Sequence, residues 1–310
     1  MLRNGRLLLN INKKHQTLSL REGLLKRNMK TIWIDGKKMA QETLDNLRPR
    51  INHLKRIPQL DVIWVGDNPA SEIYVRHKKQ KGESLGIKVD VHHLPESTTQ
   101  DGLYALINTL NEDDNVDGVM VQMPLPKHID SDGVLDMVAP SKDVDGLTTV
   151  NLGRLICGLP SLVPCTPQAC MRIIESVVPD LTGKSALVIG RSRLVGKPMF
   201  HLLLSKHCTV TQAHTKTSDL SSLCRSADIV IVATGHAGLI GGDDIKVGAV
   251  VIDVGISRQA DGKIAGDVRS DEIDGVAYAA TPVPGGVGPM TVAMLIENTV
   301  KAAEIHQGIS

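Results

Sequence analysis

The sequence predicts an α/β protein with two domains. Short apolar runs alternate with segments of helical periodicity in both halves of the chain, as is typical of parallel sheets covered by helices. A polar segment, residues 140–147, divides the halves, and 310 residues are enough for two domains with cores of their own. In the second half, a glycine-rich turn at 190–196 follows an apolar run, which predicts a strand, a turn and a helix N-terminus able to bind phosphate.

The first half is expected to form a small parallel sheet. Strands are predicted at 60–66, 87–94 and 116–126, with helices at 37–47, from 71 onward and at about 100–110. Two prolines end the third strand and place Gln122 near its carboxyl end. Ser71 is expected to cap the second helix, where Tyr74 and Lys78 lie four residues apart and therefore on one face. Because ligands bind beyond the carboxyl ends of parallel strands, Gln122 and the residues after Gly66 are candidates for a site.

The second half repeats the alternation. Strands are expected at 186–189, 209–213, 229–234, 249–254 and 276–279, with helices from Thr166 to Val178 and after Gly196. The segment 281–289 is too rich in proline and glycine for a regular element, and its glycines permit close approach of a ligand to the backbone. A long helix follows it. Its predicted apolar stripe consists of Val292, Leu295, Ile296, Val300 and Ala303.

Several interpretations compete for the glycine turn. The dinucleotide fingerprint G-x-G-x-x-G fits with Ser192 in place of the middle glycine. A triphosphate-binding loop requires four residues between its first glycine and Gly-Lys, whereas five separate Gly190 from Gly196, and Pro198 offers magnesium no hydroxyl. A serine-hydrolase elbow fails because Leu194 occupies the position of its second glycine. The motif alone leaves dinucleotide binding and a phosphate-free turn equally open.

The end of the next strand favours a dinucleotide and indicates which one. An NAD site typically has Asp or Glu there for the ribose 2′-hydroxyl, whereas an NADP site needs positive or hydroxyl groups for the 2′-phosphate. Strand 209–213 is followed by His214, Thr215 and Lys216, with no acid. Arg191 in the glycine turn adds a guanidinium suited to phosphate. The sequence therefore predicts NADP as the cofactor.

Composition excludes several other classes. The net charge of +1 and the 2% aromatic content give no sign of a nucleic-acid partner. No apolar run approaches the roughly 20 residues of a membrane span. The five cysteines include no C-x-x-C pair, which suits a reducing compartment, and the eleven histidines include no H-E-x-x-H, so no metal site is expected.

Residues 1–28 differ from the rest of the chain. They carry seven Lys and Arg against a single acid, Glu22, and their apolar patch at 7–11 is too short for a secretory signal. An organelle-targeting peptide and a flexible basic arm are alternatives. We favour a start codon assigned too early, because strand-like sequence begins at Met29. The expected location is accordingly cytoplasmic, and mitochondrial only if residues 1–28 are a real targeting peptide.

Six motifs in one order resemble those of a known family. They are NPASEIYVRHK (68–78), VQMPLP (121–126), KDVDGL (142–147), PCTP (164–167), GRSRLVGKP (190–198) and TPVPGGVGPMT (281–291). From residue 29 to the C-terminus the chain resembles the bifunctional methylenetetrahydrofolate dehydrogenase/methenyltetrahydrofolate cyclohydrolase family. Two departures are small: Met123 stands where Leu is common, and Thr215 where Ser is common beside the NADP phosphate.

The resemblance implies a function and a set of site residues. Lys78 would be catalytic with Gln122 beside it, Tyr74 would pack on the folate, Asp145 would anchor the pterin, and loop 282–288 would line the cleft. Substrate-binding residues would be Ser71, Tyr74, Asp145, Pro282, Gly285 and Gly286. Cofactor-binding residues would be Gly190, Arg191, Ser192, Val195, Gly196, His214, Thr215, Thr234 and Ile256.

It also implies the organisation of the molecule. A folate-binding catalytic domain, 29–150 completed by 281–310, would face a Rossmann-type NADP-binding domain, 151–280, across a cleft, and the protein would be a homodimer acting on tetrahydrofolate derivatives. A lysine base near pH 7 needs its pKa moved from ~10.4 to ~7–8, which costs about 3–5 kcal/mol and which burial beside a neutral partner such as Gln122 would supply.

The residues alone leave two other functions possible. One is a two-domain NAD(P)-dependent dehydrogenase of another substrate class, such as an amino-acid dehydrogenase, and the other is a cofactor-binding protein without activity. A Tyr-x-x-x-Lys pair also occurs in short-chain dehydrogenases, but there it follows the glycine turn, whereas Tyr74 and Lys78 precede it. An isolated pair of this kind is more often a solvated helix face than a catalytic one.

Overall fold

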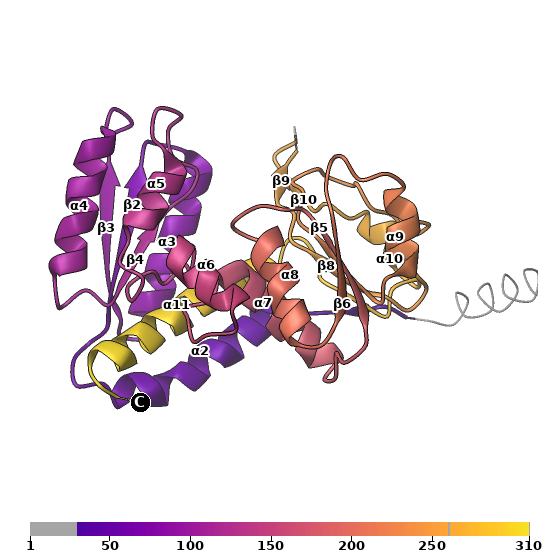
Figure 1. Ribbon diagram of the computed structural model, residues 1–310, viewed down its shortest axis with the longest axis horizontal. Helices are drawn as coiled ribbons and strands as arrows, with labels where there is room; N and C mark the ends of the chain where they lie inside the picture. Colours follow the sequence, from indigo (N-terminus) through magenta and orange to yellow (C-terminus); the bar gives the residue numbers. More distant parts are fainter. Residues whose placement is uncertain (1–29, 260, 310) are drawn as a thin grey trace, which may run out of the picture.

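The computed structural model describes residues 30–259 and 261–309. The chain forms two α/β lobes joined by a layer of helices (Figure 1), which confirms the predicted fold class. Residues 1–28, for which a targeting peptide, a basic arm and a misassigned start were considered, lie outside the described residues. Within those residues, no helix is long and apolar enough to cross a membrane.

The first lobe is built on a three-stranded parallel sheet in the order β3-β2-β4. The strands are β2 (Gln59–Val65), β3 (Lys88–Leu94) and β4 (Gly118–Val121), and the helices are α2 (Gly36–Asn52), α3 (Pro69–Glu83), α4 (Gln100–Glu112) and α5 (Ser131–Met137). Every residue of the central strand β2 is buried, as expected for a parallel strand covered on both faces. In the register, Val62 lies opposite Val91 on one side and Met120 on the other.

The second lobe contains a six-stranded parallel sheet in the order β1-β11-β8-β7-β5-β6. Its strands are β1 (Ile32–Trp33), β5 (Ser185–Ile189), β6 (Thr209–Ala213), β7 (Ile229–Val232), β8 (Val250–Asp253) and β11 (Ala279–Ala280). Its other elements are α8 (Gly196–Ser205), α9 (Leu220–Ser226), α10 (Ser270–Ile273) and the antiparallel pair β9 (Ser257–Arg258) and β10 (Ile264–Ala265). The strand order reverses at β5, which has β6 on one side and β7 on the other, and such switch points bind ligands in open α/β sheets.

Strand β1 lies in a different sheet from the one predicted. The sequence assigned residues 29–150 to the first domain, but Ile32 and Trp33 pair with β11 at the edge of the second sheet. The chain reaches the first lobe only with α2. The strand-like sequence after Met29 did not indicate a partner strand, and the pairing depends on β11, which lies far away in the chain.

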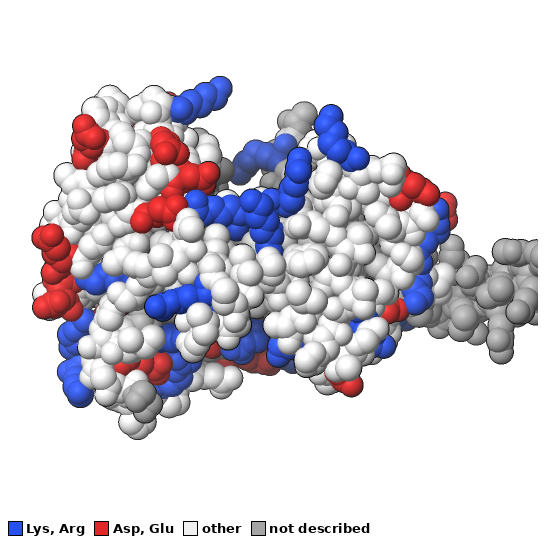
Figure 2. All heavy atoms as spheres, viewed as in Figure 1, with Lys and Arg blue, Asp and Glu red and all other residues white. Residues whose placement is uncertain are grey.

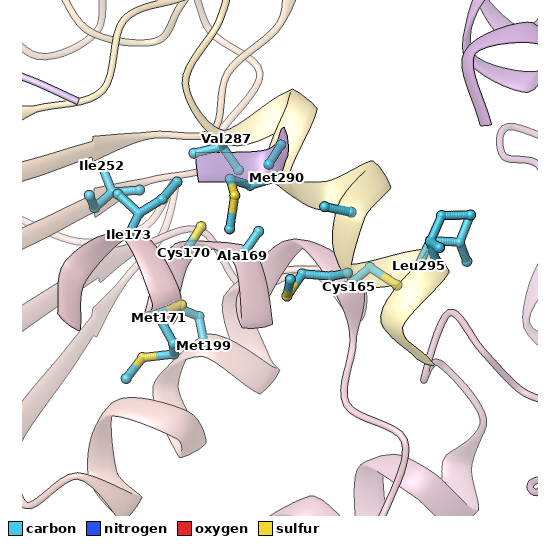
Figure 3. Packing of buried hydrophobic residues seen from close by; sticks show 14 of the residues in the cluster. Cys165, Ala169, Cys170, Met171, Ile173, Met199, Ile252, Val287, Met290 and Leu295 are labelled. Carbon is cyan, nitrogen blue, oxygen red and sulfur yellow. The ribbon is translucent and has the colours of Figure 1, made fainter. Parts of the chain in front are cut away.

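Helices α7 (Cys165–Val177) and α11 (Val287–His306) pack against each other between the lobes. Figure 3 shows Ile173 of α7 beside Ile252 of β8, and Met290 of α11 near Ala169 and Cys170. The apolar stripe predicted for α11 is too narrow, because α2 and α7 cover the helix from two sides and bury residues such as Ala293 and Met294 as well. With α6 (Thr149–Ile156), these helices fix how the two sheets face each other.

Candidate active site

A cavity of about 970 Å³ lies between the lobes and is lined from both sides. Figure 2 shows the notch between the lobes on one face of the molecule, with basic and acidic side chains mixed beside it. Every residue predicted for catalysis or substrate binding lines this cavity: Lys78, Gln122, Tyr74, Asp145, Ser71, Pro282, Gly285 and Gly286. Val195 and Ile256, which were predicted to bind the cofactor, lie on the opposite wall. The predicted catalytic and substrate-binding residues therefore meet in one place, together with two of the nine predicted cofactor residues.

The Lys78 amine is buried at the centre of this cavity. It lies on α3 and is 8% exposed, and its Nζ donates a hydrogen bond of 2.9 Å to Oε1 of Gln122. A second contact, 3.3 Å, joins Nζ to Sδ of Met120 on β4. The Gln122 amide is oriented because its Nε2 donates to the carbonyl of Met123 at 2.7 Å, which leaves Oε1 to face the lysine.

Burial lowers the pKa of the Lys78 amine. Desolvation penalises the ammonium form, and the negative charge of Asp145 opposes this shift without cancelling it. The neutral Gln122 satisfies the amine without holding its proton as a carboxylate partner would. A lysine in this state can take up and release a proton nearer neutral pH than an exposed one.

Asp145 faces the lysine from a loop that is fixed on several sides. The preceding residue, Val144, accepts hydrogen bonds through its carbonyl from Asn298 Nδ2 (2.9 Å) and Cys165 Sγ (3.3 Å). The Asp143 carboxylate closes the turn by accepting from the Leu147 amide at 3.0 Å. Burial raises the pKa of the Asp145 carboxyl, while the positive charge of Lys78 opposes that rise. The carboxyl oxygens of Asp145 are acceptor atoms suited to the N–H groups of a heterocycle.

The entry to α3 differs from the prediction. Ser71 was expected to cap this helix, but α3 begins at Pro69, and Oδ1 of Asn68 accepts from the Ser71 amide at 3.4 Å. The Ser71 side chain is buried and lines the cavity instead. The same displacement occurs at α7, which begins at Cys165 rather than after Thr166. The sequence placed Pro69 in the preceding loop and Pro167 at the first helical position, but both helices begin two residues earlier than expected.

The loop 282–288 is held close to the start of α2. A Cβ on Gly36 would lie 1.9 Å from the carbonyl oxygen of Gly286, so no other residue fits there without moving the loop. Tyr74 projects from α3 into the same space and is half-buried, and burial raises the pKa of its hydroxyl. An aromatic ring opposite a glycine-rich backbone forms a narrow slot for a flat ligand.

The glycine turn after β5 has the close contacts of a dinucleotide fingerprint. Gly190 has a φ of +129°, and a Cβ added to it would lie 2.4 Å from the Ala233 carbonyl oxygen. A Cβ added to Gly196 would lie 2.2 Å from the carbonyl oxygen of Gly190. Both glycines are therefore required by sterics. Ser192 replaces the middle glycine, and its Oγ accepts from the amides of Val195 (3.1 Å) and Gly196 (3.4 Å) at the start of α8.

The remaining predicted cofactor residues share one edge of the second sheet, although they do not line the cavity. His214 and Thr215 follow β6, Thr234 follows β7 and Arg191 follows β5, so all lie at carboxyl ends of parallel strands. The Arg191 and Thr215 side chains are exposed. No acid stands directly at the end of β6, and these donors fit a ribose phosphate. In the described part of the chain, no group of three His, Cys, Asp or Glu could hold a metal ion.

Sequence reasoning missed two buried acids on the cofactor side. Asp253 ends β8 and lines the cavity, and burial raises the pKa of its carboxyl to about 6. Asp267 is fully buried and accepts hydrogen bonds from the Thr234–Gly235 turn. The one available signal was a glycine within two residues of each acid, Gly255 after Asp253 and Gly266 before Asp267, in otherwise apolar surroundings, a pattern that is usually a simple turn.

Two family models match the chain. Residues 34–145 match the tetrahydrofolate dehydrogenase/cyclohydrolase catalytic domain, and residues 164–307 match the NAD(P)-binding domain of the same family. The bifunctional protein FolD of Wolbachia sp. subsp. Drosophila simulans (strain wRi) is 49% identical over 284 residues, which cover 90% of this chain and 97% of that protein. The chain belongs to the tetrahydrofolate dehydrogenase/cyclohydrolase family. The resemblance found in the sequence is thereby confirmed.

Solved structures of the tetrahydrofolate dehydrogenase/cyclohydrolase family have the same fold. The bifunctional FolD enzyme of Campylobacter jejuni superposes with a TM-score of 0.87 at 47% identity, covering 89% of this chain and 99% of that one. The FolD enzyme of Trypanosoma brucei, complexed with NADP cofactor and inhibitor, gives a TM-score of 0.85 at 35% identity, covering 89% and 98%.

Proposed function

We propose that this protein is a bifunctional folate enzyme. It oxidises methylene-tetrahydrofolate to methenyl-tetrahydrofolate with NADP and hydrolyses the product to formyl-tetrahydrofolate. The observation that carries this proposal is the buried Lys78–Gln122 pair in a cavity whose opposite wall belongs to the cofactor-side sheet edge. Family membership and the FolD relatives support it.

Lys78 is the acid–base group of the hydrolysis. In its neutral form the amine accepts a proton from water that attacks the methenyl carbon, and as ammonium it returns a proton to the ring nitrogen that leaves. Gln122 holds the amine in place and keeps a neutral environment around it. A positioned acid–base group of this kind contributes ~10²–10⁴ in rate.

The dehydrogenase step depends on alignment rather than on proton transfer. Tyr74 and the 282–288 loop form the two sides of a slot for the pterin, and Asp145 accepts hydrogen bonds from its N–H groups. NADP, when bound, accepts the hydride from the methylene carbon. Holding two reacting carbons in line supplies several kcal/mol of the barrier reduction, up to about 7–11 kcal/mol in well-oriented systems.

The glycine turn and the basic edge are the parts that hold NADP. Gly190 and Gly196 let the backbone approach the pyrophosphate, and the dipole at the start of α8 favours its negative charge. Arg191, His214 and Thr215 are positioned by their strands to receive the 2′-phosphate. Thr234 and Ile256 follow the next two strands and complete the cofactor side.

Domain division, assembly and location are part of the same proposal. The folate domain consists of residues 34–150 with α11, and the NADP domain of residues 151–280 with β1. A homodimer and a cytoplasmic location follow from the resemblance to the family. The five free cysteines, four of them buried, support a reducing compartment.

A single assay tests the proposed function. For the dehydrogenase, the protein is mixed with methylene-tetrahydrofolate and NADP, and the formation of NADPH and methenyl-tetrahydrofolate is followed at their separate absorbance maxima. For the cyclohydrolase, methenyl-tetrahydrofolate is added in a second cuvette and its hydrolysis is followed. Both activities are expected. Turnover of an amino acid in place of the folate, or no turnover at all, would contradict the proposal.

Arg191→Ala is expected to weaken NADP binding about 10–100-fold, because a hydrogen bond to a charged group contributes about 1.5–3 kcal/mol. NAD, which has no 2′-phosphate, should bind within twofold of its affinity for the unaltered protein. Isothermal titration with each cofactor measures both changes. Arg225→Ala is the control, since Arg225 lies in the last turn of α9, which precedes the amino end of β7 at the opposite edge of the sheet. Equal losses for NADP and NAD would refute the role of Arg191.

A further inference from the structure

The Asp253 carboxylate closes the base of a loop that reaches into the cavity. Asp253 is 4% exposed, and its Oδ1 accepts from the amides of Gly255 (2.8 Å) and Asp267 (2.9 Å). Its Oδ2 accepts from the Val268 amide at 2.9 Å. These bonds hold together the two ends of the segment that contains β9 and β10. That segment places Ile256 on the cavity wall.

Asp267 continues the network toward the cofactor edge. Its Oδ2 accepts three hydrogen bonds, from the Thr234 amide (2.6 Å), the Thr234 hydroxyl (2.9 Å) and the Gly235 amide (2.9 Å). Its Oδ1 is buried and has no hydrogen-bond partner. A Cβ on Gly255 would lie 2.2 Å from that oxygen, so the glycine is needed for the acid to fit.

The network also reaches the substrate side through the backbone. The Asp253 amide donates to Oγ1 of Thr281 at 2.8 Å, and Thr281 begins the segment that leads into the 282–288 loop. Asp253 therefore connects β8 with the segment that carries Ile256 and with the 282–288 loop. Asp267 connects the end of the Ile256 segment to the Thr234–Gly235 turn after β7. Every hydrogen-bond donor in this network is a backbone amide or a hydroxyl, and none of the described donors is a cation.

We propose that Asp253 and Asp267 are positioning residues for the dehydrogenase reaction, which set the place of Ile256 and Thr234 relative to the folate slot. The inference rests on the proposed function and extends it. Two buried acids so close together are costly, and three of their four carboxylate oxygens accept hydrogen bonds that fix two loops of the cofactor side. Among the described residues, the hydrogen bonds of Lys78 and Gln122 go to each other, to Met120 and to Met123 rather than to either carboxylate, so we expect hydrolysis to be affected less than the dehydrogenase.

Asp253→Asn tests the first acid. Both oxygens of Asp253 accept backbone amides, so an asparagine must turn its own N–H₂ group toward at least one donor, and the loop moves. We expect dehydrogenase kcat/KM to fall by at least about tenfold with a raised KM for NADP. Hydrolysis of added methenyl-tetrahydrofolate should stay within twofold. Asp261→Asn, an exposed carboxylate in the same loop that accepts only from its neighbour Lys263, is the control.

Asp267 offers a matched pair of variants. Only Oδ2 is used, so the single carbonyl oxygen of Asp267→Asn can accept all three bonds, whereas Asp267→Ala loses them. We expect Asp267→Ala to lose about tenfold or more in dehydrogenase activity and Asp267→Asn to recover most of it. If all three variants keep full dehydrogenase activity, or if both activities fall together in proportion to thermal stability, the proposal is wrong.

NADP affinity, measured by titration without folate, separates this inference from the proposed function. Weaker NADP binding in Asp253→Asn and Asp267→Ala, with unchanged binding in Asp261→Asn, supports the positioning role even if the unaltered protein fails to turn over folates. Unchanged NADP binding together with unchanged KM overturns it. Loss of folate turnover in the unaltered protein would instead count against the proposed function.

Discussion

Lys78→Met is expected to abolish cyclohydrolase activity, with a loss of ~10²–10⁴ in rate. The variant keeps the approximate length of the side chain but removes the amine that donates to Gln122. NADP binding should be unchanged, since Lys78 lies on the wall formed by the first lobe. Hydrolysis of methenyl-tetrahydrofolate and titration with NADP measure the two properties. Lys79→Met is the control: the neighbouring lysine pairs with Glu83 on the helix surface.

The same variant has a defined effect on stability. The pKa of Lys78 is lower in the folded than in the unfolded chain, so between the lowered pKa and 10.5 the unfolded chain binds more protons. The free energy of unfolding of the unaltered protein therefore rises with pH in this window. Lys78→Met should remove that dependence and be at least as stable near neutral pH. Wild-type hydrolysis in the variant would show that another group is the acid–base catalyst.

Asp145→Asn is expected to lower both activities, each by about 10–100-fold, because the carboxylate would hold the pterin in both reactions through hydrogen bonds of a charged acceptor. It should also change the pH profile of hydrolysis. The negative charge of Asp145 raises the pKa of Lys78, so its removal lowers that pKa further. If hydrolysis needs the neutral amine, activity should then persist to lower pH.

Initial rates of hydrolysis across pH, compared with those of the unaltered protein, measure this shift. Asp114→Asn, an exposed acid outside the cavity, serves as the control. An acid limb that moves to higher pH would contradict the proposed coupling between the two groups. Loss of the dehydrogenase alone would contradict a shared pterin site.

Local sequence predicted the elements of the fold well. The strand at 209–213 has the predicted bounds, and the helix at 100–110 extends by only two residues to Glu112. Both signals are periodic and do not depend on distant contacts. The residues alone placed Gln122 and the segment after Gly66 at one rim of the sheet, and the resemblance to the family implied Gln122 beside Lys78. Their hydrogen bond follows from packing that the spacing alone does not specify.

What sequence reasoning missed depends on contacts between distant segments. Strand β1 exists only because β11, almost 250 residues later, offers its edge. The burial of α11 on two sides requires α2 and α7 together. Asp253 and Asp267 look like turn acids in the sequence, and their role is visible only when the loops of the cofactor side are in place.

The central claim is that the folate carbon and the nicotinamide meet in one cavity between the lobes. Methylene-tetrahydrofolate that carries deuterium on the methylene carbon is incubated with NADP and Lys78→Met, in which hydrolysis is blocked, and the NADPH formed is examined by mass spectrometry. Direct transfer predicts NADPH with one deuterium and no loss of label to water. Unlabelled NADPH, or label released into solvent, would contradict the claim.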